Sequence, residues 1–244
     1  MKKAIVITDL TRMYQGRVCI AGYGENGQCI RPVLPPPGIP ESALYKSGKV
    51  IIYPFALVEF NLLEPVPQPP HSEDWRYDPS SPRFIRIVYE RKKILSWSLF
   101  KTINDVFEQP IHDDWGYYVL DCQGTRSLGT IKPDEIIEVI YGPDKKGTWD
   151  YRLKFTDSIG SIYRLKITDL TWHYYCDSLR DDARQPLQIA AVLTQKLKST
   201  ETFLRIGLSR GWKEYPDRCY LQFIGIFTFP DFLEGRTFAD LAPK

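Results

Sequence analysis

Basic and aromatic side chains alternate in several short segments of this sequence. They are Arg12, Tyr14, Arg17, Tyr23 and Arg31 in the first half, and Trp172, Tyr174, Arg210, Trp212 and Lys213 in the second. An aromatic ring can stack on a nucleic-acid base, worth roughly 1–3 kcal/mol per base, while arginine and lysine follow the phosphates. The alternative is that the rings pack inside the protein and the basic groups are ordinary solvated surface. We expect some of these residues to form a groove for single-stranded nucleic acid.

Other reactive side chains do not match a known catalytic or metal-binding pattern. Asp9 and Asp169 could serve as paired carboxylates for acid–base or metal chemistry, but each is better explained as a residue that starts a turn. The run His112-Asp113-Asp114 has metal-ligand residue types, yet no second histidine is placed nearby, so a solvated loop is the better interpretation. The sequence contains no Ser-His-Asp, zinc-protease, P-loop or kinase signature. We therefore expect a protein that is not an enzyme and binds no metal or other cofactor.

The cysteines indicate a reducing environment. They are Cys19, Cys29, Cys122, Cys176 and Cys219, an odd number without any C-x-x-C spacing. With only three histidines, a structural zinc site is not expected. We expect no signal peptide, because Met1-Lys2-Lys3 leads directly into a strand, and no apolar run is long enough to cross a membrane. These features predict a cytoplasmic protein with reduced thiols.

A five-residue phrase occurs twice and organises both halves of the chain. Ile7-Thr8-Asp9-Leu10-Thr11 is repeated letter for letter as Ile167-Thr168-Asp169-Leu170-Thr171. Each copy ends a β-branched run that predicts a strand, and the Thr-Asp pair then predicts a turn. Each copy is expected to lead into a tyrosine-bearing loop. Duplication of a related unit and chance similarity of two strand ends both remain open, and the copies need not lie on equivalent strands.

The first half has the pattern of a β-rich unit with one helix. Residues 3–8 predict a strand, and residues 17–24 and 28–33 predict a hairpin around Asn26-Gly27. Further short strands are predicted at 49–60, 84–88, 117–121, 127–130 and 135–140. A helix is predicted between Ser96 and Pro110, where Leu99, Phe100, Ile103, Val106 and Phe107 share one face. The proline-rich segments 34–40 and 64–82 are predicted to be surface excursions.

The second half repeats this arrangement after a polar, glycine-bearing segment, residues 141–147, which is the best candidate for a domain boundary. Strands at 151–156 and 163–168 alternate between an apolar and a cationic face. A buried helix is predicted to begin near Pro186 and to cover 187–198. Two further strands are predicted at 203–208 and 220–227.

This order of elements matches the OB-fold plan, a small antiparallel barrel with a helix between its third and fourth strands. We predict a mainly β (α+β) protein of two OB-like barrels, each with one helix. The domains are expected at 1–143, with the proline-rich insertions, and at 144–244. A β-sandwich or a PUA-like barrel would suit the same periodicity nearly as well.

The charge balance limits the strength of any non-specific binding. The sequence has 32 basic and 30 acidic residues, for a net charge of +2. Proteins that bind duplex nucleic acid through phosphates alone usually have a larger excess. Aromatic residues make up 14% of the chain, which is more than two small cores need, so we expect some in grooves or interfaces.

Several segments resemble the prokaryotic dual OB-containing domain family. They are Ile5–Thr11, Val18–Gly22, Cys29–Val33, Val139–Tyr141, Ile167–Trp172 and Cys219–Leu221. The resemblance spans nearly the whole chain and implies two OB-like barrels in one compact unit. It also implies nucleic-acid recognition, often in bacterial conflict or defence systems.

These observations together predict a non-catalytic module that binds or senses single-stranded DNA or RNA, in a bacterial defence system. One alternative is a scaffold subunit of a defence-type complex that holds a protein partner with its proline-rich segments. A second alternative is a small-ligand sensor with a pocket lined by the excess aromatic residues. No membrane partner is expected.

Overall fold

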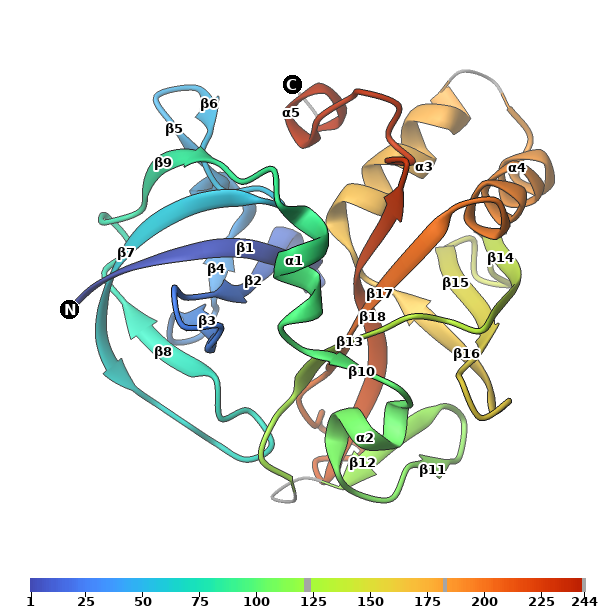
Figure 1. Ribbon diagram of the computed structural model, residues 1–244, viewed down its shortest axis with the longest axis horizontal. Coiled ribbons are helices and arrows are strands. Elements are labelled where there is room, and N and C mark those ends of the chain that lie inside the picture. Colours follow the sequence, from blue (N-terminus) through green and yellow to red (C-terminus); the bar gives the residue numbers. More distant parts are fainter. Residues whose placement is uncertain (121–123, 182–183, 243–244) are drawn as a thin grey trace.

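The computed structural model describes residues 1–120, 124–181 and 184–242. Two β-rich units lie side by side, the first running from blue to teal and the second from light green to red (Figure 1). Strands predominate over helices in both, which confirms the mainly β prediction. No described helix has the length and hydrophobicity needed to cross a membrane.

The first unit is a closed barrel. Its strands are β1 (Lys2–Arg12), β2 (Arg17–Tyr23), β3 (Cys29–Val33), β7 (Ala56–Pro65) and β8 (Asp74–Tyr77). They are ordered β1-β2-β3-β8-β7, and β7 pairs back with β1. The β3–β8 pair is parallel and the others are antiparallel. Alternate apolar residues such as Ile5, Ile7, Ile20, Val58 and Phe60 point inward and are fully buried, because strand side chains alternate between two faces.

The connections of this barrel are short elements. A 3-10 helix, η1 (Tyr14–Gly16), joins β1 to β2. Strand β9 (Arg83–Ile87) pairs with the N-terminal part of β7. Between β3 and β7 lie β4 (Ile39–Pro40), the 3-10 helix η2 (Glu41–Leu44), β5 (Tyr45–Lys46) and β6 (Lys49–Val50). The two proline-rich segments are thus only in part surface excursions: segment 34–40 adds β4 to β2 and segment 64–82 contains β8, while residues 35–37 and 67–69 are exposed. Because β8 itself has no proline, it can pair on both sides.

The helix expected between Ser96 and Pro110 is divided. Helix α1 (Arg91–Ser96) ends before β10 (Leu99–Phe100), and α2 (Ile103–Phe107) follows. Thr102 begins α2 with a reciprocal capping box, its hydroxyl accepting from the Asp105 N–H at 3.1 Å. This cap starts a new helix in the middle of the expected one, so Leu99 and Phe100 belong to a strand instead.

The second unit repeats the strand order of the first. Its elements are β14 (Glu135–Pro143), β15 (Trp149–Thr156), β16 (Ile162–Ile167), α3 (Leu170–Asp181), α4 (Pro186–Lys198), β17 (Glu201–Leu208) and β18 (Arg218–Phe229). The strands are ordered β14-β15-β16-β18-β17, again with a parallel pair, β16–β18, between the third and the last. In the described chain, two helices, α3 and α4, lie between the third and fourth strands, where we expected one, and in the first unit only the 3-10 helix η2 lies at this place.

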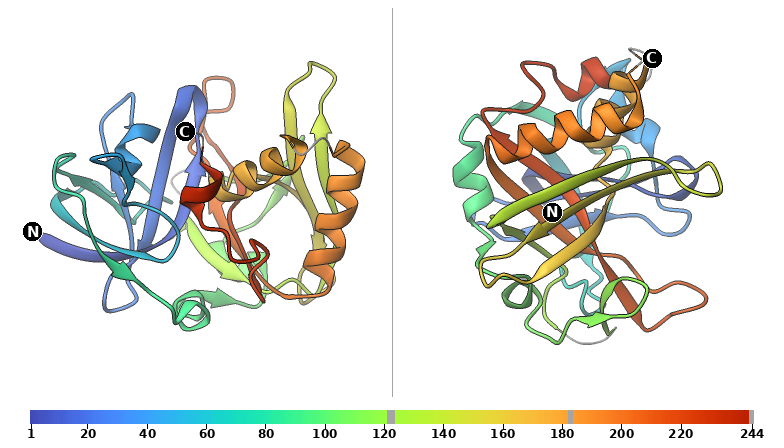
Figure 2. Two further views of the ribbon diagram at one scale, coloured as in Figure 1. Left: turned by 90° about the horizontal axis from the view of Figure 1, so that it is seen from above. Right: turned by 90° about the vertical axis from the view of Figure 1, so that its right-hand side faces the viewer.

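This second barrel is closed by a helix. Among the described strands, β14 and β17 do not pair, and α4 packs against β14 in the gap (Figure 2). The Thr194 hydroxyl accepts from the Val139 N–H at 2.8 Å, while Ile189, Leu193 and Leu197 are buried in the core. The helix therefore satisfies part of the open strand edge.

The chain passes from the first sheet to the second before residue 143, where we expected the domain boundary. Strands β11 (His112–Asp113), β12 (Tyr117–Leu120) and β13 (Leu128–Ile131) join the second sheet, as does β10. Residues 144–148 form the turn of the β14–β15 hairpin, where the Asp144 carboxylate accepts from the Lys146 and Thr148 N–H groups at 2.8 and 2.9 Å. A polar, glycine-bearing segment suits a tight turn as well as a linker. A short helix, α5 (Phe238–Leu241), ends the described chain.

The two copies of the repeated phrase meet where the units join. Thr11 and Asp169 form an isolated antiparallel bridge, and the Arg12 N–H donates to the Thr168 carbonyl at 2.7 Å. The first copy lies at the end of β1, the first strand of its barrel. The second follows β16, the third strand of the other, so the copies do not occupy equivalent positions.

Candidate functional site

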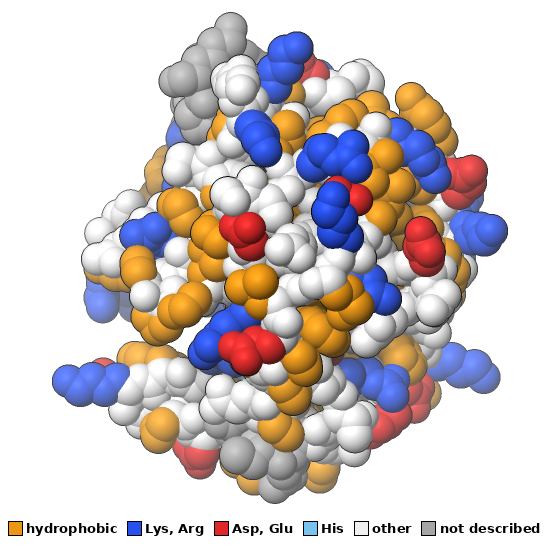
Figure 3. Space-filling view, turned by 90° about the vertical axis from the view of Figure 1, so that its left-hand side faces the viewer, with side chains coloured by type: hydrophobic (Ala, Val, Ile, Leu, Met, Phe, Trp, Pro, Cys, Tyr) orange, Lys and Arg blue, Asp and Glu red, His pale blue; other side chains and the backbone are white. Residues whose placement is uncertain are grey.

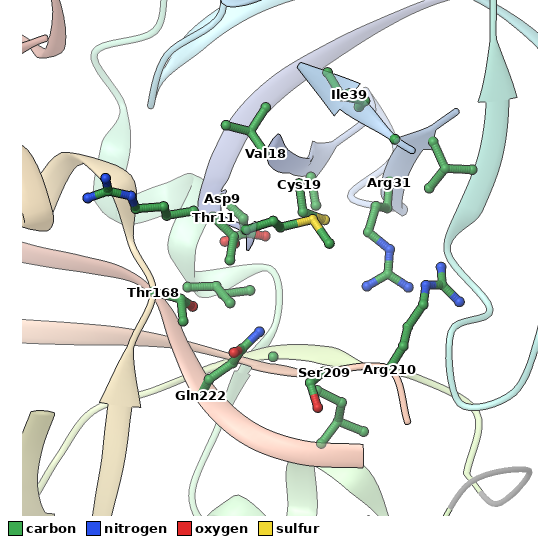
Figure 4. A pocket seen from close by; sticks show the side chains of 18 of the residues that line it. Asp9, Thr11, Val18, Cys19, Arg31, Ile39, Thr168, Ser209, Arg210 and Gln222 are labelled. Carbon is green, nitrogen blue, oxygen red and sulfur yellow. The ribbon is translucent and has the colours of Figure 1, made fainter. Parts of the chain in front are cut away.

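A cavity of about 460 Å³ opens between the two units (Figure 4). One wall comes from the end of β1, the β1–β2 loop, β2, β3 and the β7–β8 loop. The other comes from the facing parts of β16, β17 and β18. Oligonucleotides and oligosaccharides bind OB-folds on strands 2 and 3 and on the loops between strands 1 and 2 and strands 4 and 5. In the first barrel those elements are the ones that form this wall.

Four cationic side chains line the cavity: Arg12, Arg31, Lys166 and Arg210. Arg12 and Arg31 come from the first unit, and Lys166 and Arg210 from the second, so the charge concentrates only when both units are in place. Neither Arg12 nor Lys166 forms an ion pair with any residue in the described part of the chain. The cavity therefore carries more local positive charge than the net charge of the chain suggests.

Arg31 and Arg210 share one buried carboxylate. The Arg31 Nε donates to Asp74 Oδ1 at 2.6 Å, and the Arg210 Nη2 pairs with Asp74 Oδ2. The Arg31 and Asp74 side chains are 5% and 3% exposed, whereas Arg210 is about half exposed at the mouth of the cavity. A second carboxylate, Glu73, lies 3.9 Å from Arg31 Nη2 and accepts instead from the backbone and hydroxyl of Ser127.

His71 lies in the β7–β8 loop at the same end of the cavity and is only 2% exposed. The Ser209 backbone is close to its ring, but neither ring nitrogen makes a hydrogen bond of normal geometry to a described residue. Burial first, and then the positive charges of Arg31 and Arg210, lower the pKa of His71 to about 2. The ring is therefore neutral at physiological pH.

The pKa of His71 makes a testable prediction about stability. The unfolded chain takes up a proton at His71 below about pH 6.5, while the folded protein does not, so acid favours unfolding. Between pH 7 and pH 4.5 the wild type should lose roughly 2–3 kcal/mol more unfolding free energy than a His71→Asn variant. Urea titrations of both proteins at several pH values measure this difference. Burial lowers the pKa of His173 to about 4, but this residue is present in both proteins and its effect cancels. An equal change of unfolding free energy with pH in the wild type and the variant would contradict the prediction.

The predicted binding residues divide into three groups in the structure. Arg12, Tyr14, Arg31 and Arg210 line the cavity. Trp212 and Lys213 are exposed on the β17–β18 loop directly after Arg210, and Arg17 is half-buried at the start of β2, outside the cavity lining. Tyr23, Trp172 and Tyr174 are buried, and a buried ring has no free face for a base.

Tyr23 belongs to the contact between the units. Its hydroxyl accepts from Arg205 Nη1 at 2.5 Å, and its ring packs edge-on against Trp97. Arg205 in turn forms a bidentate pair with Asp9, at 2.7 and 2.6 Å. Asp9 therefore does not start a turn as we expected: it lies within β1, and its carboxylate is neutralised by an arginine from the other unit.

Trp172 and Tyr174 lie in helix α3, not in the loop that we expected after the second copy of the phrase. The Asp169 carboxylate accepts from the Thr171 N–H at 2.9 Å and caps this helix, and its other oxygen accepts from the Ile226 N–H at 3.0 Å. Trp172 packs on Phe232, while Tyr174 packs on Phe238 and donates to Glu41. The Asp169 carboxylate is thus used within the fold, as the turn interpretation expects.

The other chemical candidates are also engaged in local contacts. His112 stacks on Tyr118, and Asp114 pairs with Arg218 at 2.8 Å. Within the described ranges, no group of three or more His, Cys, Asp and Glu side chains is placed to hold a metal ion. Cys19, Cys29 and Cys176 are free thiols, and Cys122 lies outside the described residues.

Sequence reasoning missed Lys166 and His71, which line this cavity, and Asp74, which pairs with Arg31 and Arg210. Lys166 was recognised only as part of the cationic face of its strand. His71 and Asp74 lie in a segment that the sequence indicated to be a surface excursion. The proximity of His71 and Asp74 to Arg31 depends on the parallel pairing of β8 with β3, which places Asp74 beside Arg31.

Two OB-like barrels with a cationic cavity between them define a dual OB-fold module. The model of the dual OB-containing domain family matches residues 3–226, and the chain belongs to this family. This finding confirms the resemblance noted in the sequence. A search of curated proteins found no match to the chain.

Proposed function

We propose that the protein binds single-stranded DNA or RNA in the cavity between its two units and catalyses no reaction there. One observation carries the proposal: the cavity occupies the ligand-binding face of the first barrel, and cations from both units converge on it. Arg12 and Lys166, which have no carboxylate partner among the described residues, are available to contact phosphates.

Exposed aromatic rings lie beside these cations. Tyr14 in the β1–β2 loop is 85% exposed and lines the cavity, and Trp212 is 50% exposed two residues beyond Arg210. Each can stack on a base without disturbing the core. The volume of the cavity suits single nucleotides, because small-ligand pockets of about 300–1,000 Å³ enclose groups of that size.

The outer face of the first unit lacks this concentration of charge. Basic, acidic and apolar side chains are mixed across it (Figure 3). Parts of the two proline-rich segments that a protein-scaffold function would use pair with strands of the barrel, which weakens that alternative. A cytoplasmic role as a sensor in a bacterial defence system is part of the proposal, and its support is the family resemblance.

Fluorescence anisotropy with labelled single-stranded DNA, single-stranded RNA and duplex tests the proposal at low and physiological salt. A Tyr14→Ala/Trp212→Ala variant should bind single strands at least about tenfold more weakly, because two stacking rings are removed. A Tyr89→Ala/Trp115→Ala variant is the matched control, since these rings are 77% and 98% exposed but lie outside the cavity lining.

Two outcomes would argue against this function. Failure of the wild type to bind any nucleic acid at low salt would exclude it. An equal loss of affinity in the control variant would show that exposed aromatic residues contribute without a defined site.

A further inference from the structure

One end of the cavity contains a pair of arginines whose guanidinium groups are held by a shared carboxylate. One buried carboxylate, Asp74, binds the guanidinium groups of both Arg31 and Arg210. The parallel pairing of β3 with β8 fixes Arg31 beside Asp74, and Arg210 reaches the same carboxylate from the β17–β18 loop. Figure 4 shows the two guanidinium groups turned toward one another from opposite units. Their orientation is therefore set before any ligand arrives.

Some polar atoms at this end of the cavity have no hydrogen-bond partner of normal geometry among the described residues. Arg31 Nη2 makes no hydrogen bond to the described residues, although the side chain is only 5% exposed. The nearest carboxylate, Glu73, is 3.9 Å away and is used by Ser127. Neither nitrogen of the buried His71 ring has a partner of normal geometry in the described part of the protein. Buried polar groups in native proteins are nearly always paired with protein groups, ordered water or a ligand, and the two side chains that carry these unpaired atoms line the cavity.

The chemistry of these groups selects an anion with several acceptor oxygens. Guanidinium groups present N–H donors in a planar fork that matches phosphate. Asp74 and Glu73 balance Arg31 and Arg210, so the excess positive charge of the cavity comes from Arg12 and Lys166 nearby. A phosphate between Arg31, Arg210 and His71 would accept from the two guanidinium groups and from the one N–H of the neutral imidazole, and it would use this excess charge.

We propose that Arg31, Arg210 and His71 form a subsite for a phosphomonoester, the terminal phosphate of a nucleic-acid strand. The inference rests on the proposed function and adds the position of the strand end. Arg31 and His71 are 5% and 2% exposed, so the group that reaches them must enter end-on. An internal phosphodiester continues into chain on both sides and cannot enter in this way, whereas a terminal phosphate can.

The test compares strands of one sequence that carry a 5′-phosphate, a 3′-phosphate or only hydroxyl ends. The wild type should bind one of the phosphorylated strands about tenfold or more tightly than the hydroxyl strand. Arg210→Gln should abolish this preference, and Arg76→Gln should keep it. Arg76 is the matched control, because its side chain is 50% exposed against 48% for Arg210 and it pairs with one carboxylate, Glu64, away from the cavity.

The outcomes separate the subsite from the proposed function. Equal affinity of wild type for all three strands would overturn the subsite and leave single-strand binding intact. Loss of the preference in Arg76→Gln as well as Arg210→Gln would also overturn it. If no strand binds, the proposed function fails, and thermal stabilisation by inorganic phosphate and by a nucleoside 5′-monophosphate decides the subsite. Stabilisation that Arg210→Gln abolishes and Arg76→Gln retains supports it, and its absence overturns it.

Discussion

Replacing Arg205 with methionine is expected to lower the free energy of unfolding by about 3–5 kcal/mol, because it leaves a buried carboxylate without its partner. Arg205 is 0% exposed on β17, and Asp9 is 1% exposed on β1 of the other unit. Their two hydrogen bonds of 2.7 and 2.6 Å join the barrels. The remaining guanidinium nitrogen donates to Tyr23, Ser98 and Thr130.

The protonation state of this arginine supports the size of the effect. Burial alone would lower the pKa of Arg205, but Asp9 and Tyr23 raise it above its ordinary value, so the side chain stays charged. Removing it forces Asp9 either to remain charged in an apolar environment or to take up a proton. Both cost free energy that the wild type does not lose.

Urea denaturation of the wild type and four variants measures this effect. Arg205→Met and Asp9→Leu should each be strongly destabilised, and the Arg205→Met/Asp9→Leu double variant should lose less than the sum of the single losses. Arg83→Met is the control, since Arg83 is 63% exposed in its pair with Glu59 and should change stability by less than about 1 kcal/mol. A loss below about 1 kcal/mol for Arg205→Met would contradict the structural role assigned to this pair.

The second large effect on stability distinguishes two tryptophans that were both predicted from the sequence to bind nucleic acid. Trp172→Ala should destabilise the protein by about 3–5 kcal/mol, since truncating a buried aromatic side chain removes apolar contacts and leaves a cavity. Trp172 is 1% exposed and packs on Phe232, whereas Trp212 is 50% exposed. Trp212→Ala should therefore change stability by no more than about 0.5 kcal/mol.

Thermal and urea unfolding of both variants decide this prediction. A Trp172→Phe variant should recover part of the loss, because it restores most of the ring volume. Similar stabilities for Trp172→Ala and Trp212→Ala would show that Trp172 is not a core residue. The comparison also guides the binding experiments, because weakened binding in Trp172→Ala would report unfolding rather than lost stacking.

Local signals in the sequence were sufficient for many elements of the fold. Alternation of apolar and cationic residues predicted strands β15 and β16, and Pro186 marked the first turn of α4. These signals succeed because strand alternation and helix starts depend on residues close together in the chain. They failed at α3, whose Trp, His, Tyr and Cys residues are weak helix formers. That helix depends on its Asp169 cap and on burial of its aromatic face.

The sequence by itself determined the mainly β class, the two OB-like barrels and four of the residues that line the cavity: Arg12, Tyr14, Arg31 and Arg210. Only the tertiary structure decided which candidates are accessible. Among the aromatic candidates, Trp172 and Tyr174 are buried in the core, and Tyr23 is part of the contact between the units. The structure also paired Asp9 with Arg205, 196 positions away, and brought His71 and Asp74 to Arg31. The physical reason is that burial and charge pairing depend on contacts between distant segments, which periodicity and spacing do not record.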